Sequence, residues 1–144
     1  PPPLWAVLLL TSFYYLSELP AVQDMPEWRH KPAGMILIAL GLIPAMASIG
    51  QFFAVGTQVH PTSKTNNKLV TNGFFAFTRN PMYLGLIVAC AGVALWFGRP
   101  LMFTAPPLIF MIANWAFIPF EEAKMRRQFG DQFDAYCGRV RRWL

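Results

Sequence analysis

Four long apolar runs constrain this chain more than any other feature of its sequence. They cover residues 4–19, 33–55, 82–97 and 101–120, and Glu18 is the only charged residue within them. At a helical rise of about 1.5 Å per residue, sixteen residues span about 24 Å and twenty span about 30 Å, the thickness of a bilayer core. We therefore expect an all-α, polytopic membrane protein with four transmembrane helices, of which the first and third are short.

Composition argues against an ordinary soluble domain. Hydrophobic residues make up 55% of the 144 positions and charged residues only 13%, whereas soluble domains carry roughly a quarter charged residues. Two cysteines, Cys90 and Cys137, are too few for a zinc site or a disulfide framework, so we expect inert thiols and no metal. The length fits one domain.

Basic residues are divided unequally between the two sides that a four-helix topology implies. Three lie on one side and nine on the other, which predicts that the side with nine faces the cytoplasm. The three are Arg29, Lys31 and Arg99, and the nine are Lys64, Lys68, Arg79, Lys124, Arg126, Arg127, Arg139, Arg141 and Arg142. The net charge of +5 is thus explained by membrane orientation, and we expect no nucleic-acid partner.

Prolines inside the second and fourth runs are expected to bend those helices. Proline removes a helical hydrogen bond, which a membrane tolerates only where protein or water satisfies the backbone. The residues are Pro44, Pro106 and Pro107.

Two segments on the predicted cytoplasmic side carry folding signals of their own. Residues 56–80 contain several aromatic side chains and the turn-forming pair Asn72-Gly73, which favours a folded cap over the helix ends. Residues 121–140 are expected to form one amphipathic helix, because apolar residues recur at spacings of four, four, three and four. These residues are Met125, Phe129, Phe133, Tyr136 and Val140.

A charged turn and an acidic pair lie at the same predicted mouth of the helix bundle. Arg79-Asn80-Pro81-Met82-Tyr83 opens the third run, and Glu121-Glu122 follows the fourth. We expect them to form one site. The alternative for the glutamates is the first turn of a helix, where carboxylates interact favourably with the helix dipole.

Several stretches of the chain resemble a known family. Two strings are similar to the cofactor segment of isoprenylcysteine carboxyl methyltransferases and their small bacterial relatives: Leu69-Val70-Thr71-Asn72-Gly73-Phe74-Phe75 and Arg79-Asn80-Pro81-Met82-Tyr83-Leu84-Gly85. The end of the family resembles Glu121-Glu122, Phe129-Gly130, Phe133, Tyr136 and Val140. The resemblance covers about residues 56–144. It implies one membrane methyltransferase domain over 1–144, with two N-terminal helices in 1–55 and a cofactor-binding core in 56–144.

The resemblance also implies a reaction. The cofactor would be S-adenosylmethionine, with S-adenosylhomocysteine as product, and the acceptor would be a lipophilic or small molecule reached from the membrane. Carried over by position, the cofactor-binding residues are His60, Asn67, Leu69, Val70, Phe75, Asn80, Pro81, Met82, Tyr83 and Glu121. For His60, a simply exposed loop residue is the alternative.

Three further residues are candidates for catalysis or for shaping the acceptor pocket. Arg79 and Glu122 are expected to pair and to tie the cap to the tail. Asn114 lies about two helical turns before Glu121, where an amide needs a partner. It is expected either to line the acceptor pocket or to make a helix–helix hydrogen bond.

The chain departs from the eukaryotic members of this family at several positions. They have histidine at the positions of Asn67 and Asn80 and tyrosine at the position of Phe75. They also carry an arginine, thought to face the substrate carboxylate, at the position of Phe117. Phenylalanine cannot bind a carboxylate bidentately as arginine does, so the resemblance supports methyl transfer more strongly than a carboxylate acceptor.

Two other functions remain open from the sequence. Membrane sterol-type reductases that use NADPH end in a pattern similar to Phe129-Gly130 and Tyr136-Cys137. A non-catalytic membrane subunit or lipid-binding scaffold would need no nucleotide-like cofactor at all.

Overall fold

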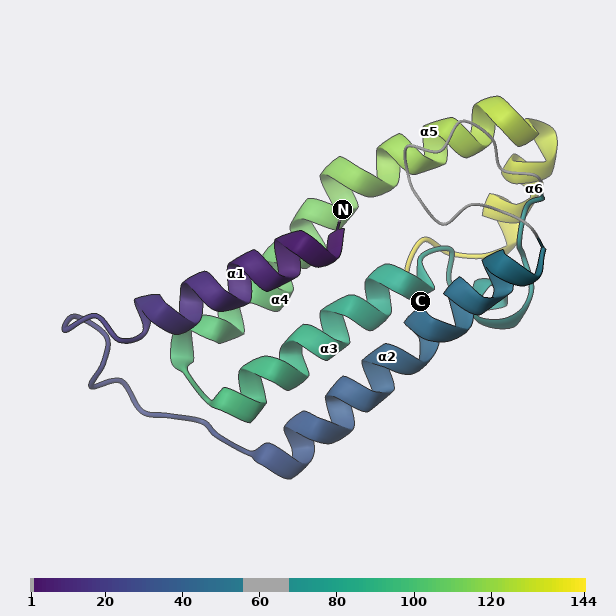
Figure 1. Ribbon diagram of the computed structural model, residues 1–144. Coiled ribbons are helices and arrows are strands. Elements are labelled where there is room, and N and C mark those ends of the chain that lie inside the picture. Colours follow the sequence, from purple (N-terminus) through teal and green to yellow (C-terminus); the bar gives the residue numbers. More distant parts are fainter. Residues whose placement is uncertain (1, 56–67) are drawn as a thin grey trace.

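The computed structural model describes residues 2–55 and 68–144, and every regular element in these two ranges is a helix (Figure 1). Three short 3₁₀ or π segments, η1 to η3, lie among the longer helices. The long elements are α1 (Pro2–Leu16), α2 (Lys31–Ala54), α3 (Pro81–Phe97), α4 (Ala105–Ile112), α5 (Ile118–Phe129) and α6 (Asp131–Arg139). Each of the four apolar runs is therefore helical, as the sequence predicts.

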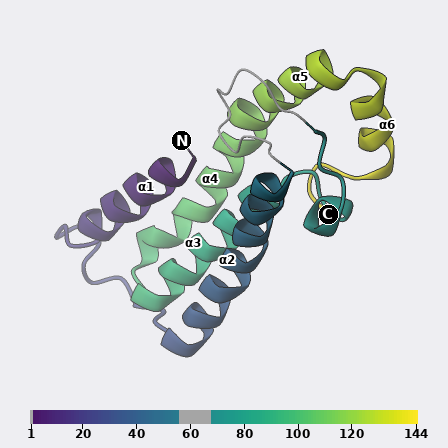
Figure 2. The same cartoon turned by 45° about the vertical axis from the view of Figure 1, so that its right-hand side comes forward.

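Helices α2 and α3 lie side by side along most of their length, and α1 and α4 form the neighbouring layer (Figures 1 and 2). Glycines make the α2–α3 contact close. A Cβ on Gly41 would lie 2.4 Å from the carbonyl oxygen of Gly85, and one on Gly92 would lie 2.6 Å from the amide nitrogen of Ile38. Small residues allow such close backbone approach between apolar helices.

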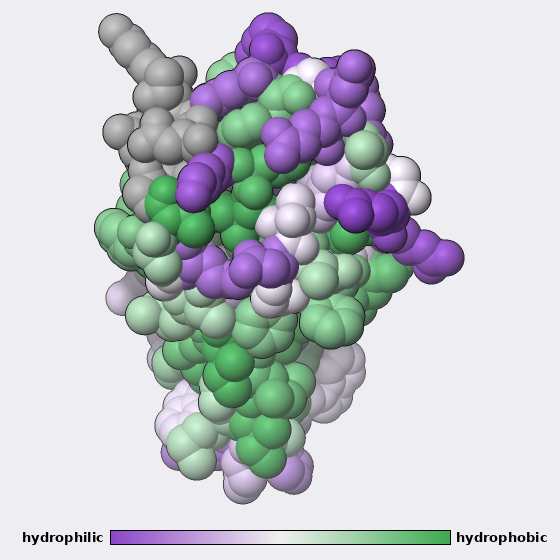
Figure 3. Space-filling view, turned by 90° about the vertical axis from the view of Figure 1, so that its right-hand side faces the viewer, coloured by the Kyte–Doolittle hydropathy of each residue, from purple (hydrophilic) through white to green (hydrophobic). Residues whose placement is uncertain are grey.

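Two stretches of the described chain are long and apolar enough to cross a membrane: Lys31–Ala54 and the continuous helical stretch Pro100–Phe129. Helices α1 and α3 are apolar but shorter, as expected. In Figure 3 hydrophilic residues gather at the upper end of the molecule, above a broad hydrophobic region. The polar end contains α5 and α6, whereas the helix bundle supplies the apolar surface.

The bend expected at Pro106 and Pro107 is not where the fourth run deviates from an α-helix. Both prolines lie in the first turn of α4, where a missing N–H costs nothing, so they begin the helix. The run deviates from an α-helix at the 3₁₀ helix η2 (Pro100–Thr104), which comes before these prolines, and at the π-helical segment η3 (Ala113–Phe117), which ends two residues before Pro119 in the first turn of α5. Proline cannot donate to the preceding turn, and a wider π turn accommodates that loss.

The prediction of one amphipathic helix over 121–140 is wrong. The chain turns at Gly130, whose φ of +50° is accessible mainly to glycine, and α6 begins at Asp131. The predicted stripe still packs together across this turn. Phe133, Tyr136 and Val140 form a buried cluster, and Met125 and Phe129 pack against it.

The predicted cap is described only in its second half. His60 and Asn67 lie outside the described residues. After residue 68 the chain forms the short 3₁₀ helix η1 (Gly73–Ala76), and Gly73 adopts a φ of +59°, as the Asn72-Gly73 turn signal suggested. Phe75 in η1 is buried and packs against Phe52 of α2, with ring centroids 5.2 Å apart.

Candidate functional site

A cavity of about 590 Å³ opens at the polar end of the bundle. Its walls come from α2, α3, α5, α6, the start of α1 and the segment that leads into η1. All eight described residues predicted to bind a cofactor line it: Leu69, Val70, Phe75, Asn80, Pro81, Met82, Tyr83 and Glu121. Segments about forty residues apart in sequence therefore meet at one cavity.

Helix α3 begins at this cavity. Asn80 is its N-cap residue, and Pro81 occupies the first turn, where its fixed φ suits a helix start. The amide nitrogen of Asn80 donates to Thr78 Oγ1 at 3.2 Å, and its Nδ2 donates to the carbonyl oxygen of Arg142 at 3.0 Å. The side chain of Asn80 is thus held against the C-terminal segment while the residue borders the cavity.

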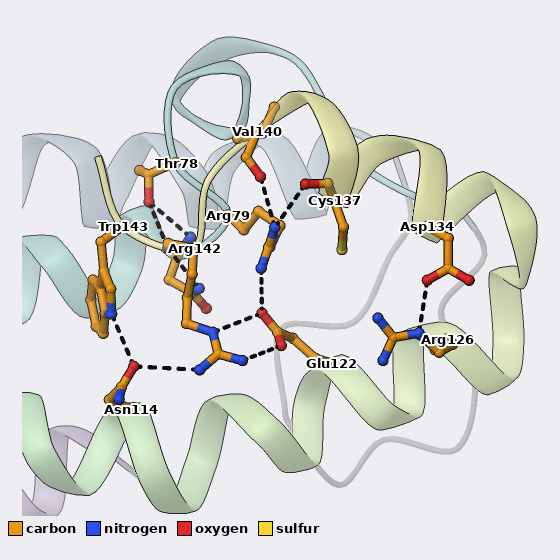
Figure 4. Close-up of polar contacts among 11 residues, drawn as sticks. Thr78, Arg79, Asn114, Glu122, Arg126, Asp134, Cys137, Val140, Arg142 and Trp143 are labelled. Atoms are coloured by element: carbon orange, nitrogen blue, oxygen red, sulfur yellow. Dashed lines mark hydrogen bonds and ion pairs between the residues drawn. The ribbon is translucent and has the colours of Figure 1, made fainter.

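The predicted pair between Arg79 and Glu122 is present, with Arg79 Nη2 3.0 Å from Glu122 Oε1 (Figure 4). Arg79 Nη1 also donates to the carbonyl oxygens of Cys137 and Val140, at 3.2 and 2.7 Å. One guanidinium therefore joins the start of α3 to α5 and to the end of α6. This is the connection between cap and tail that the sequence suggested.

Arg142 also donates hydrogen bonds to both oxygens of Glu122. Its Nη2 donates to Oε2 at 2.6 Å and its Nε to Oε1 at 3.1 Å. The side chain of Glu122 is only 14% exposed, so two arginines neutralise a carboxylate that is largely removed from water. Glu122 borders the cavity, but both of its oxygens are engaged within the protein.

Glu121 has a different environment. The hydroxyl of Tyr83 donates to its Oε1 at 2.8 Å, and among the described residues no arginine pairs with it. Tyr83 is buried and its ring stacks on that of Phe117, with centroids 6.4 Å apart. Glu121 is therefore the carboxylate that the cavity offers to a ligand.

Asn114 is not among the residues that line the cavity. It lies in η3, and its Oδ1 accepts hydrogen bonds from Trp143 Nε1 at 3.0 Å and from Arg142 Nη1 at 3.5 Å (Figure 4). The amide therefore has a partner within the protein, supplied by the C-terminal segment and not by a neighbouring helix.

Two groups near the cavity stay neutral. Burial raises the pKa of Tyr136 to about 12, and its hydroxyl donates to the carbonyl oxygen of Phe75 at 2.7 Å. Burial also raises the pKa of the Cys137 thiol. Neither group supplies a charge to the site near neutral pH.

Sequence reasoning did not single out Thr78, Arg142 or Trp143. Thr78 Oγ1 donates to the carbonyl oxygen of Arg142 at 3.1 Å, and the other contacts are given above. Arg142 was visible only as one of nine basic residues on the predicted cytoplasmic side. A basic residue twenty positions beyond an acidic pair is too weak a signal to identify its partner.

Comparison with known proteins identifies the family to which the chain belongs. The profile of the phospholipid methyltransferase family matches residues 30–132. A probable protein-S-isoprenylcysteine O-methyltransferase of Oryza sativa subsp. japonica is 26% identical over 144 residues, covering 92% of this chain and 72% of the rice protein. Protein-S-isoprenylcysteine O-methyltransferase B of Arabidopsis thaliana is also 26% identical, covering 92% of this chain and 68% of the plant protein.

A protein-S-isoprenylcysteine O-methyltransferase of Schizosaccharomyces pombe is 31% identical over 103 residues, which cover 67% of this chain and 40% of the yeast protein. No solved structure matches the chain. These matches favour methyl transfer over the reductase and the non-catalytic scaffold. The chain is a methyltransferase that belongs to the phospholipid methyltransferase family and resembles its isoprenylcysteine O-methyltransferase relatives.

Proposed function

We propose that this protein transfers a methyl group from S-adenosylmethionine to a lipophilic or small acceptor at the cytoplasmic face of a membrane. The observation that carries the proposal is the cavity itself. Eight residues predicted to bind the cofactor surround it, and it offers the carboxylate of Glu121 beside the ring of Tyr83.

The residues around the cavity fit such a cofactor. A volume of about 590 Å³ lies within the range of roughly 300–1,000 Å³ that small-molecule sites occupy. The cofactor carries ribose hydroxyls, an amino group and a sulfonium, all of which a carboxylate and aromatic rings can bind. Glu121 supplies the carboxylate, and Phe75 and Tyr83 supply rings.

Few side chains need to take part in the chemistry itself. S-adenosylmethionine, when bound, supplies a methyl group that is already activated for transfer. The protein then has to hold donor and acceptor in line, which by itself contributes much of the rate. In this proposal Glu121 orients the polar part of the cofactor, Phe75 and Tyr83 bind its ring and positive charge, and the apolar walls exclude water.

The acceptor is lipophilic or small. Much of the cavity wall is apolar, and α2 contributes Leu42, Met46 and Ile49 to it. The relatives' names specify protein-S-isoprenylcysteine as their acceptor. Phe117 stands at the position where the resembling eukaryotic enzymes have an arginine, and it stacks on Tyr83. Phe117 itself does not line the cavity. Because no arginine stands at its position to bind a carboxylate, an acceptor without a carboxylate is the better fit.

The membrane orientation completes the proposal. Four crossings, with the segment before α3 and the C-terminal segment in the cytoplasm, agree with the distribution of nine basic residues against three. The cavity then opens where a water-soluble cofactor is available, while an apolar acceptor reaches it from the bilayer.

Calorimetric titration of the detergent-purified protein with S-adenosylhomocysteine tests the proposal. We expect saturable binding with one site per chain. A folded protein that binds no S-adenosylhomocysteine would contradict the cofactor assignment, and NADPH would then be titrated as the ligand of the reductase alternative.

A further inference from the structure

The C-terminal segment after α6 is bound to three helices through Arg142 and Trp143 (Figure 4). The guanidinium of Arg142 donates two hydrogen bonds to Glu122 of α5, one to each carboxylate oxygen. Such bidentate pairs fix the direction of approach as well as adding energy. Arg142 is therefore placed to control how α5 is oriented.

Arg142 is itself held firmly. Its carbonyl oxygen accepts hydrogen bonds from the side chains of Thr78 and Asn80, at 3.1 and 3.0 Å. The backbone amide of Arg79 donates to the carbonyl oxygen of Arg141 at 3.0 Å. These backbone and side-chain contacts fix the segment to the start of α3. The guanidinium of Arg142 therefore approaches Glu122 from a fixed backbone position.

Trp143 adds a second anchor on the other side of the segment. Its Nε1 donates to Asn114 Oδ1 at 3.0 Å, and its ring lies 4.9 Å from the ring of Phe110 in α4. Asn114 is part of η3, the π-helical segment. The C-terminal segment therefore contacts the chain both before α5 begins, at Asn114 in the fourth run, and within α5, at Glu122.

The local structure before α5 explains why the contacts of Arg142 and Trp143 matter for the orientation of this helix. A π turn contains one residue more than an α turn, which rotates the following helix by about 100° relative to an uninterrupted α-helix. Pro119 then lacks the N–H that would bond to this turn. The rotation of α5 therefore differs from that of an uninterrupted helix, and the hydrogen bonds of Arg142 to Glu122 hold α5 in this rotation.

Glu121 and Glu122 are adjacent in α5, so fixing one fixes the direction of the other. We propose that Arg142 is a positioning residue that acts through Glu122 to hold Glu121 in the cavity beside Tyr83. This inference rests on the proposed function, in which Glu121 binds the cofactor. It assigns Glu122 and Arg142 to orientation and Glu121 to ligand binding.

A double-mutant cycle read by calorimetry with S-adenosylhomocysteine tests the inference. We expect Arg142→Gln to weaken binding roughly tenfold in the otherwise unaltered protein, and less than about twofold when Glu121 is already glutamine. Glu121→Gln keeps the shape and hydrogen-bonding capacity of the side chain, so that its residual binding can be measured. Thermal unfolding of each variant reports stability separately from affinity.

Arg141→Gln is the matched control, because it makes the same change one residue earlier on an exposed side chain. It should leave the affinity unchanged. If Arg142→Gln does not fold, Arg142→Lys is used instead, because it keeps the positive charge and loses the bidentate pair with Glu122. Its loss of affinity should be smaller, and it should likewise disappear in the Glu121→Gln background.

An equal loss of affinity in both backgrounds, or no loss in either, would overturn the positioning role. Absence of binding by the unaltered protein would reject the proposed function and this inference with it. Normal binding by the unaltered protein with an additive cycle would reject the inference alone, so the two failures can be told apart.

Discussion

Glu121 and Glu122 are neighbours in sequence, yet their surroundings assign them different tasks. Arg79 and Arg142 both pair with the carboxylate of Glu122, whereas Glu121 accepts a hydrogen bond from Tyr83 at the cavity wall. A carboxylate that is already paired with two guanidiniums has little capacity to bind a ligand. The structure therefore confirms the pairing of Glu122 with Arg79 that the sequence predicts, and cofactor binding by Glu121 stays a prediction.

Replacing Glu121 by alanine should abolish binding of S-adenosylhomocysteine without unfolding the protein. The substitution removes the carboxylate and one hydrogen-bond acceptor of Tyr83 but leaves the contacts of Glu122 in place. Calorimetry measures the binding, and thermal unfolding in detergent measures the fold. Asp131→Ala, which removes an exposed carboxylate outside the cavity, is the control. Wild-type affinity in the Glu121→Ala variant would contradict the site.

Tyr136 should make the stability of the protein depend on pH in the alkaline range. Its pKa rises from the ordinary value of 10.0 to about 12 in the folded protein because the hydroxyl is buried. Its contribution to the free energy of unfolding is complete below pH 10 and is lost as the pH rises through about 12. Thermal unfolding of wild type and Tyr136→Phe between these limits should therefore converge with increasing pH. Parallel curves would contradict this role.

The sequence predicts those site residues that lie in contiguous motifs. Residues 69–83 and the acidic pair were found because each is a short string with recognisable chemistry, and the cofactor-binding candidates within them all line the cavity. Arg142 and Trp143 were missed. Their partners lie between 20 and 64 residues away, and their meeting depends on how α6 folds back after Gly130.

At the scale of the elements, the same glycine explains the one wrong helix. The apolar spacing in 121–140 is that of a continuous helix, and a single glycine inside a helical pattern is often tolerated. The structure uses its positive φ instead to turn the chain between α5 and α6. The stripe then packs on itself as a folded hairpin around Phe133 and Tyr136. Periodicity predicted which residues pack together, but not the break between them.

The close contact between α2 and α3 depends on having no side chain at Gly92. A Cβ there would lie 2.6 Å from the amide nitrogen of Ile38 and 2.7 Å from the carbonyl oxygen of Gly34, both backbone atoms that cannot move independently. Gly92→Ala should therefore lower the free energy of unfolding by about 1–3 kcal/mol. The measurement is thermal or denaturant unfolding in detergent.

Gly50→Ala provides the matched control in α2. Apart from the neighbouring residues and the backbone of α2 itself, no atom of the described residues lies within 4 Å of a Cβ at Gly50, so alanine gains helix propensity there without a clash. We expect it to raise the free energy of unfolding by about 0.5–1 kcal/mol. A destabilisation of the same size at both positions would show that loss of glycine flexibility, and not the close approach of two helices, causes the effect.

At the scale of the whole molecule, the apolar runs predicted the all-helical architecture, and four membrane crossings stay a prediction. The four runs are four helical stretches, and the short linker 98–100 turns α3 back along α4 (Figure 1). The sequence could not predict the cavity. It arises where α2 and α3 meet α5, α6 and the start of α1. Only tertiary packing brings these elements together.

The proposed orientation makes the accessibility of introduced cysteines alternate along the chain. In a background with both native cysteines replaced by serine, Gln23→Cys and Thr104→Cys should react with a membrane-impermeant maleimide on intact spheroplasts. Phe77→Cys and Gln132→Cys should react only after the membrane is opened. All four side chains are exposed in the structure, so failure to react reports the membrane side and not burial in the protein.

This pattern requires α3 to cross the bilayer although it has only 17 residues. A helix of that length is near the lower limit for a crossing, and the bilayer has to thin or the flanking residues have to reach the interface. If α3 did not cross, Phe77 and Thr104 would react from the same side. That outcome would contradict the proposal that Arg79 and Glu121 both lie at the cytoplasmic side. It would also contradict the four-crossing arrangement on which the proposed access of the cofactor depends.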